Sequence, residues 1–139
     1  MSDCIFCRIV AGDASAFKVA EDARTLTFMD LFPAAEGHVL VIPKAHADNI
    51  FSIPASDSSA VSMQVRRVAF ALRQLLSPDG LTVSQANGVA AGQTVAHYHV
   101  HLIPRSQWAP MQWHGTEAAN AEQLSALARS LAEKLQEID

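Results

Sequence analysis

The sequence predicts an α+β domain in which a five-stranded antiparallel sheet carries two main helices. Short segments of strand-like pattern are bounded by turn residues, and two longer segments show helical periodicity. These segments do not alternate regularly as strand, helix, strand, which argues against a parallel sheet. The chain has 139 residues, 50% of them hydrophobic and 17% charged, so residues 1–139 are predicted to form one compact domain.

The first three predicted strands lie in the N-terminal third of the chain. Residues 17–21 and 25–29 are expected to be two short strands joined by a turn at Asp22-Ala23. Residues 37–43 contain the apolar run Val39-Leu40-Val41-Ile42 and end at Pro43, as a buried strand would.

Two amphipathic helices are predicted from apolar residues at steps of three and four. The first helix covers residues 57–76 and is ended by Ser77-Pro78-Asp79-Gly80. The second lies near the C-terminus, at about residues 118–138. The apolar positions on which these two predictions depend are Val61, Val65, Val68, Leu72 and Leu75, and then Leu124, Leu127, Leu131, Leu135 and Ile138.

The last two predicted strands are residues 81–85 and 97–103, with a turn at Asn87-Gly88 and Pro104 closing the second strand. In that second strand His97, His99 and His101 alternate with apolar residues, so all three rings should project from one face. Neighbouring rings then leave the backbone about 6–7 Å apart, close enough to share one small ligand. A structural role, a metal site and a nucleophilic site all remain open. Residues 105–116 cannot be placed from pattern alone.

The loop before the histidines has the composition of a phosphate pocket. Gly92 permits positive φ and a close approach of ligand to backbone, and consecutive amides at such a bend can bind an anion. Thr94 adds a hydroxyl, while Gln85 and Asn87 add side-chain amides. Asn-Gly is also an ordinary turn signal, so that dipeptide by itself predicts nothing about ligands.

Charge and composition exclude several classes of partner. The net charge of −4 offers no general attraction to nucleic acid or to an anionic membrane. The start of the chain lacks a secretory signal pattern and the apolar runs are too short to span a bilayer, so a cytoplasmic protein is expected. The pair Cys4-Ile5-Phe6-Cys7 has a spacing typical of metal or redox sites.

Residues 92–105, GQTVAHYHVHLIPR, resemble the histidine triad (HIT) family of nucleotidyl hydrolases and transferases. Residues 4–9, 28–30 and 37–44 are similar to further landmarks of the family, so the resemblance covers about residues 4–105. It implies the HIT-like fold and a homodimer. The short cysteine-containing start and the length resemble bacterial Hint-type proteins, often nucleoside phosphoramidases, whereas Gln85 before Asn-Gly resembles the Fhit branch, which cleaves dinucleoside polyphosphates.

The resemblance implies that His99 attacks the α-phosphate of a purine nucleotide adduct and forms a nucleotidyl-histidine intermediate, which water hydrolyses. It also implies that His101 binds the phosphoryl oxygens and that His38 supports His101 or the leaving group. The nucleotide-binding residues implied in the same way are Asp30, at the ribose, and Gln85, Asn87, Gly92, Gln93 and Thr94. Asp30 could instead cap the turn before Pro33, and His38 could be an ordinary histidine at a strand end.

A structural zinc site is a further implication, because several bacterial members of the family combine the cysteine pair with two histidines. The four ligands would be Cys4, Cys7, His46 and His97, in a closed tetrahedral Cys₂His₂ site. The alternative is a reduced thiol pair without metal. A redox role is disfavoured because no thioredoxin-like pattern surrounds the pair.

Two rival functions remain open from the sequence. The first is a catalytic zinc hydrolase in which His97, His99 and His101 all bind an open metal site. The second is a nucleotide-binding scaffold protein without catalysis.

Overall fold

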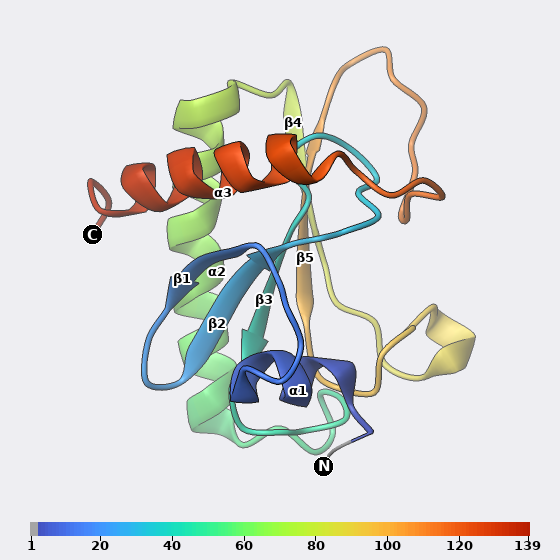
Figure 1. Cartoon of the computed structure of the whole chain (residues 1–139). Helices are drawn as coiled ribbons and strands as arrows, with labels where there is room; N and C mark the ends of the chain where they lie inside the picture. The colour runs from blue at the N-terminus through green and yellow to red at the C-terminus, as the bar shows by residue number, and fades with distance from the viewer. Residues whose placement is uncertain (1–2) are drawn as a thin grey trace.

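The computed structural model describes residues 3–139 and confirms the predicted class, with five antiparallel strands in the order β1-β2-β3-β5-β4 (Figure 1). The first two residues of the predicted domain lie outside the described residues. The strands are β1 (Lys18–Glu21), β2 (Thr25–Met29), β3 (Val39–Pro43), β4 (Gly80–Ser84) and β5 (Val100–Arg105). The helices are α1 (Ile5–Ala11), α2 (Ala55–Leu76), the 3₁₀ turn η1 (Val89–Ala91) and α3 (Ala121–Leu135).

Helices cover both faces of the central strands, which are buried along their whole length. Helices α2 and α3 cross each other on one face, and α1 lies on the other (Figure 1). Successive side chains of β3 point to opposite faces of the sheet. Val39 and Val41 therefore pack in the cluster with α2 and α3, while Leu40 and Ile42 pack in the cluster with α1. The face toward α1 is also the face that carries the site described below.

The two main helices that were predicted are α2 and α3, and the short helix α1 was not predicted. This helix has seven residues, too few to show a helical period, and its N-cap is Cys4, whose sulfur accepts a hydrogen bond from the Cys7 N–H. Sequence rules look for Ser, Thr, Asp or Asn at that position. Gly12, with φ of 84°, ends the helix in the left-handed conformation.

The predicted bounds of the histidine strand were also wrong. Strand β5 begins at Val100 rather than at His97, because the Tyr98 N–H bonds to the Ala47 carbonyl instead of to β3. At its other end β5 passes through Pro104, which pairs only with β4, since the pairing with β3 ends at Leu102. A proline is tolerated where one side of a strand has no partner.

The loop from β4 to β5 differs from the tight turn predicted at Asn87-Gly88. It runs over residues 85–99 and contains η1, so the strands pair without a hairpin turn. The remaining bounds of strands and helices differ from the predicted ones by three residues or fewer. Within the part of the chain that the structure describes, the helices lack the combination of length and apolar character needed to cross a bilayer.

Gly37→Ala should destabilise the fold more than Gly12→Ala, although both glycines have positive φ. A Cβ at Gly37 would lie 2.5 Å from Leu76 Cδ1 and 3.1 Å from Pro104 Cγ, whereas a Cβ at Gly12 meets nothing within 4 Å. The backbone penalty is about 1–2 kcal/mol at either position, and crowding at Gly37 adds about 1–3 kcal/mol. Urea unfolding of both variants measures the difference; equal losses would contradict the close contact at Gly37.

Candidate active site and metal centre

The three histidines share one face of the sheet, as the alternation predicts. The ring centroids of His99 and His101 are 4.8 Å apart, and Phe6 of α1 meets His97 and His99 edge-on, at 5.8 and 5.2 Å. Tyr98, with the intervening Val100 and Leu102, packs in the opposite cluster. The alternation therefore holds through residues 97–99, although these precede β5.

Histidine 99 has one nitrogen occupied and one directed away from the backbone. Its Nδ1 lies 2.7 Å from the His97 carbonyl oxygen, which can only accept, so Nδ1 carries the proton and donates it. The lone pair is therefore on Nε2. Burial lowers the pKa of His99, despite the opposing effect of that hydrogen bond. A buried, neutral imidazole with a bare nitrogen is a nucleophile.

A chain of hydrogen bonds fixes the protonation of His38 and His101. The Ala34 N–H donates to His38 Nδ1 at 2.9 Å, so the proton of His38 is on Nε2. That Nε2 lies 2.9 Å from His101 Nδ1, to which it donates, which leaves the proton of His101 on its own Nε2. Burial, aided by neighbouring positive charge, lowers the pKa of His38 to about 4 and that of His101 to about 3. His101 is thus a neutral N–H donor.

The position of Asp30 is compatible with both roles considered for it from the sequence, which are capping the turn before Pro33 and binding the ribose. One oxygen, Oδ1, accepts a hydrogen bond of 2.8 Å from the Phe32 N–H, which is the turn-capping contact. The other, Oδ2, lies 3.5 Å from His38 Nε2. Burial raises the pKa of this carboxyl group. Asp30 also borders the cavity that holds His99 and His101.

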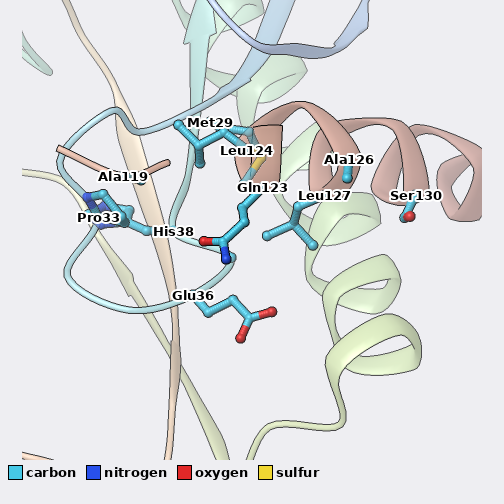
Figure 2. A pocket seen from close by; sticks show the side chains of 11 residues that line it. Met29, Pro33, Glu36, His38, Ala119, Gln123, Leu124, Ala126, Leu127 and Ser130 are labelled. Atoms are coloured by element: carbon cyan, nitrogen blue, oxygen red, sulfur yellow. The ribbon is translucent and has the colours of Figure 1, made fainter. Parts of the chain in front are cut away.

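That cavity has a volume of about 460 Å³, within the size range of ligand sites. Its polar lining groups include Asp30, Thr94, His99, His101 and His114, and its apolar lining comes mainly from α1 and from the end of β2. A further cavity of about 510 Å³ lies between α3 and the loop after β2 (Figure 2). It is lined by His38 but by neither His99 nor His101, so the reactive rings point to the first cavity.

The loop before the histidines contributes to the site in part. Thr94 lines the cavity of His99, and Gly92, with φ of 94°, lines a smaller hollow of about 440 Å³ beside His101. The amides of Gln85 and Asn87 bond to each other, at 2.6 and 3.0 Å. The Gln93 Oε1 atom accepts a hydrogen bond from the Gly88 N–H, and Gln93 Nε2 donates to the carbonyls of residues 48 and 95. These three amides hold the loop in the structure, and their contact with phosphate remains a prediction.

The four predicted metal ligands come together although they span 93 residues of sequence. His97 Nδ1 lies 3.4 Å from Cys4 Sγ and 3.5 Å from Cys7 Sγ, and His46 Nδ1 lies 3.2 Å from Cys7 Sγ and from His97 Nδ1. Their ligand atoms all lie within 4.8 Å of one another.

The hydrogen bonds of both ligand histidines leave the correct nitrogen bare. His97 Nε2 donates to the Pro43 carbonyl at 2.8 Å, and His46 Nε2 donates to the Asp48 carboxylate at 2.7 Å, so each Nδ1 is a lone-pair donor. Two such nitrogens 3.2 Å apart repel unless a cation lies between them. In a tetrahedral zinc site the nitrogens are separated by about 3.3 Å and each nitrogen–sulfur pair by about 3.5 Å. The residues present therefore fit zinc.

Asp48 and His114 lie at the two sites but were not predicted from the sequence. Asp48, two residues after His46, orients that ring, and the spacing of histidine and carboxylate was a usable signal. His114, in the segment that could not be placed, lies with its ring 5.7 Å from that of His101. Trp113 lies beneath the Arg105 guanidinium at 5.6 Å and lines the hollow of Gly92, whereas Trp108 is 89% exposed.

Acidification should destabilise the protein through His38 and His101. Their pKa values of about 4 and about 3 in the folded state lie below the unfolded reference of about 6.5. The stability that depends on these neutral rings is complete above about pH 6.5 and is lost as the pH falls, because the unfolded chain binds protons first. His101→Asn should reduce the slope of unfolding free energy between about pH 4.5 and 6.5, by up to about 1.4 kcal/mol per unit. Identical slopes in urea unfolding would count against the buried neutral pair.

Known proteins resemble this chain in sequence and in fold. The HIT domain family matches residues 11–108. The adenosine 5′-monophosphoramidase of Candida albicans is 36% identical over 144 residues, covering 99% of this chain and 95% of that protein. A Hit-like protein of Bartonella henselae superimposes with a TM-score of 0.90 at 31% identity, over 95% of this chain and 96% of that one. A zinc-bound histidine triad family protein of Mycobacterium smegmatis gives 0.85 at 33% identity, over 97% and 96%. The chain belongs to the HIT family.

Proposed function

We propose that the protein is a nucleotidyl hydrolase or transferase that cleaves a purine nucleotide adduct at its α-phosphate through a nucleotidyl intermediate on His99. The observation that carries this proposal is the 2.7 Å bond from His99 Nδ1 to the His97 carbonyl, which leaves Nε2 bare in a ligand-sized cavity. Membership of the family and the relative named as an adenosine 5′-monophosphoramidase support the same class.

The other groups of the cavity suit the charges that arise during this reaction. As His99 attacks, negative charge builds on the phosphoryl oxygens, and the N–H on His101 Nε2 is available to bind them. The forming bond makes the His99 ring cationic, and its Nδ1–H remains bonded to the His97 carbonyl. The bond from phosphorus to the leaving group breaks as the His99 bond forms, with its electron pair on the leaving group. Water then attacks the same phosphorus and loses a proton to solvent, and His99 leaves as the neutral ring.

We further propose the parts that the nucleotide contacts. Asp30 would bind the ribose hydroxyls, and the apolar lining from α1 and β2 would hold the purine. Gly92 and Thr94, beside His101 and His99, would contact the phosphate together with the amides of Gln85, Asn87 and Gln93. Phosphoramidates and dinucleoside polyphosphates both satisfy this arrangement.

The homodimer and a cytoplasmic location also remain predictions. Strand β4 is an edge strand with Val83 50% exposed, where a second sheet could join.

His99→Ala should abolish the covalent intermediate while leaving nucleotide binding measurable. With an adenosine phosphoramidate as substrate, we expect turnover to fall by at least about 10³-fold, because His101, the ring beside His99, presents an N–H rather than a lone pair to the cavity. Mass spectrometry of the rapidly quenched wild-type protein should show one added adenylyl group on His99. A variant that turns over at a rate near that of the wild type would contradict the mechanism. Binding of nucleotide without turnover by the wild type would favour the scaffold function.

Zinc in the Cys4, Cys7, His46 and His97 cluster is proposed to be structural. When bound, it would join the start of α1 to the segment before β5 and supply stability rather than Lewis-acid chemistry. The rings of the triad do not converge on one ion, because Nδ1 of His97 faces the cysteines, Nδ1 of His99 faces a carbonyl and Nδ1 of His101 faces His38. A catalytic site made by all three histidines is therefore disfavoured.

Cys7→Ser should lower the zinc content from about one atom per chain and reduce the melting temperature. Zinc in about 1,000-fold excess over its Kd stabilises the fold by about 4 kcal/mol, and this contribution would be lost. Asp48→Asn is the matched control, since it keeps four ligands and weakens zinc binding only about 10–100-fold. Elemental analysis and thermal melting provide the readouts. If chelation abolishes formation of adenylyl-His99 in protein that is still folded, zinc is catalytic and the structural assignment is wrong.

A further inference from the structure

His114 extends the row of imidazoles by one ring beyond the triad. Its ring meets that of His101 edge-on, with centroids 5.7 Å apart, and His101 in turn lies 4.8 Å from His99. The chain reaches this place by a segment without regular structure between β5 and α3, so no strand or helix positions the ring.

Gly115 explains why His114 stays beside the site. The Gly115 N–H bonds to the Phe32 carbonyl at 3.1 Å, and a Cβ on Gly115 would lie 2.1 Å from the Pro33 carbonyl oxygen. Only glycine permits this approach. The Ala119 N–H bonds to the Leu31 carbonyl at 3.0 Å, so both sides of the segment are fixed to the loop that carries Asp30.

His101 and His114 are the two residues that line both the cavity of His99 and the hollow beside Gly92. If the nucleoside occupies the larger cavity, as in the proposed function on which this inference rests, the α-phosphate lies at the junction near His99. The group that leaves phosphorus then departs toward the hollow. That hollow is lined by Ser84, Ala91, Gly92 and Trp113, besides the two histidines.

The buried histidines are poor sources of the proton that a leaving amine or alkoxide requires. Burial keeps His38 and His101 neutral, and their hydrogen bonds occupy Nδ1 of each ring. The Nδ1–H of His99 is bonded to the His97 carbonyl, and its Nε2 is the nucleophile. His114 is exposed to solvent, and among residues 3–139 its ring has one ring contact, with His101, and no hydrogen bond. Imidazole is a common general acid in catalysis, and solvent can reach this ring to return its proton.

We propose that His114 is the general acid for the leaving group. His99 Nε2 forms the bond to the α-phosphorus, and the bond from phosphorus to the leaving nitrogen or oxygen breaks with its electron pair on that atom. The proton on the His114 ring passes to the same atom, which gives the neutral amine or alcohol, nucleotidyl-His99 and a neutral His114. Solvent returns a proton to His114 before the next turnover.

The test compares His114→Ala on two substrates that share one nucleotide. An alkylamine phosphoramidate of AMP has a leaving group that must be protonated, whereas the p-nitrophenyl ester of AMP releases a stable anion without help. We expect the rate of adenylyl-His99 formation to fall by about 10²-fold or more on the amide and by less than about 3-fold on the ester. Hydrolysis of preformed adenylyl-His99 should change little.

Trp108→Ala is the matched control, because it removes a highly exposed side chain from the same segment. We expect it to leave both rates unchanged. Equal losses on the two substrates would mean that His114 only shapes the site, and no loss on either would mean that it has no role; both results overturn the proposal. Failure of the proposed function is a separate result, since wild-type protein would then form no adenylyl-His99 with either substrate.

Discussion

Backbone carbonyl groups decide which nitrogen of His97 and of His99 is bare, and the chemistry proposed for both sites depends on that choice. The His97 carbonyl takes the Nδ1 proton of His99 and exposes Nε2 to the cavity, while the Pro43 carbonyl takes the Nε2 proton of His97 and exposes Nδ1 to the cysteines. Neighbouring histidines two residues apart therefore present opposite nitrogens, that of His99 to the cavity and that of His97 to the cysteines. Burial of the rings favours the neutral forms on which this depends.

Helix α1 links the two sites physically. Cys4 caps it and is one of the four proposed metal ligands, and two residues further Phe6 packs edge-on against His97 and His99. A metal bound at the start of this helix would hold the wall of the cavity beside His99 in place without itself lying in that cavity. On the other side of the cavity, the contacts of Gly115 with Phe32 and Pro33 hold the segment that carries His114 against the loop that contains Asp30.

Much of the candidate site could be predicted because it follows local rules. Strand alternation correctly placed the triad on one face even where His97 lies outside the strand. The cysteine spacing indicated a metal or redox site, and the resemblance to the HIT family implied the full set of four ligands. Helix α1 was not predicted, because its seven residues are too few to show a helical period and its N-cap is a cysteine rather than a usual capping residue. The place of His114 beside the site was not predicted, because it depends on a close approach between Gly115 and Pro33. These residues are far apart in the sequence, and local sequence patterns do not predict such a contact. The sequence predicts a tight turn after β4 where the structure has a longer loop, because Asn-Gly is a turn signal both in a two-residue hairpin and within a longer loop.

The claim that His99 is neutral and carries its proton on Nδ1 can be tested directly by nitrogen-15 NMR of the histidine side chains. Long-range proton–nitrogen spectra at neutral pH should show a protonated Nδ1 and a bare Nε2 for His99, assigned by comparison with His99→Ala. A spectrum with the proton on Nε2, or with both nitrogens protonated at that pH, would contradict the nucleophile assigned to this protein.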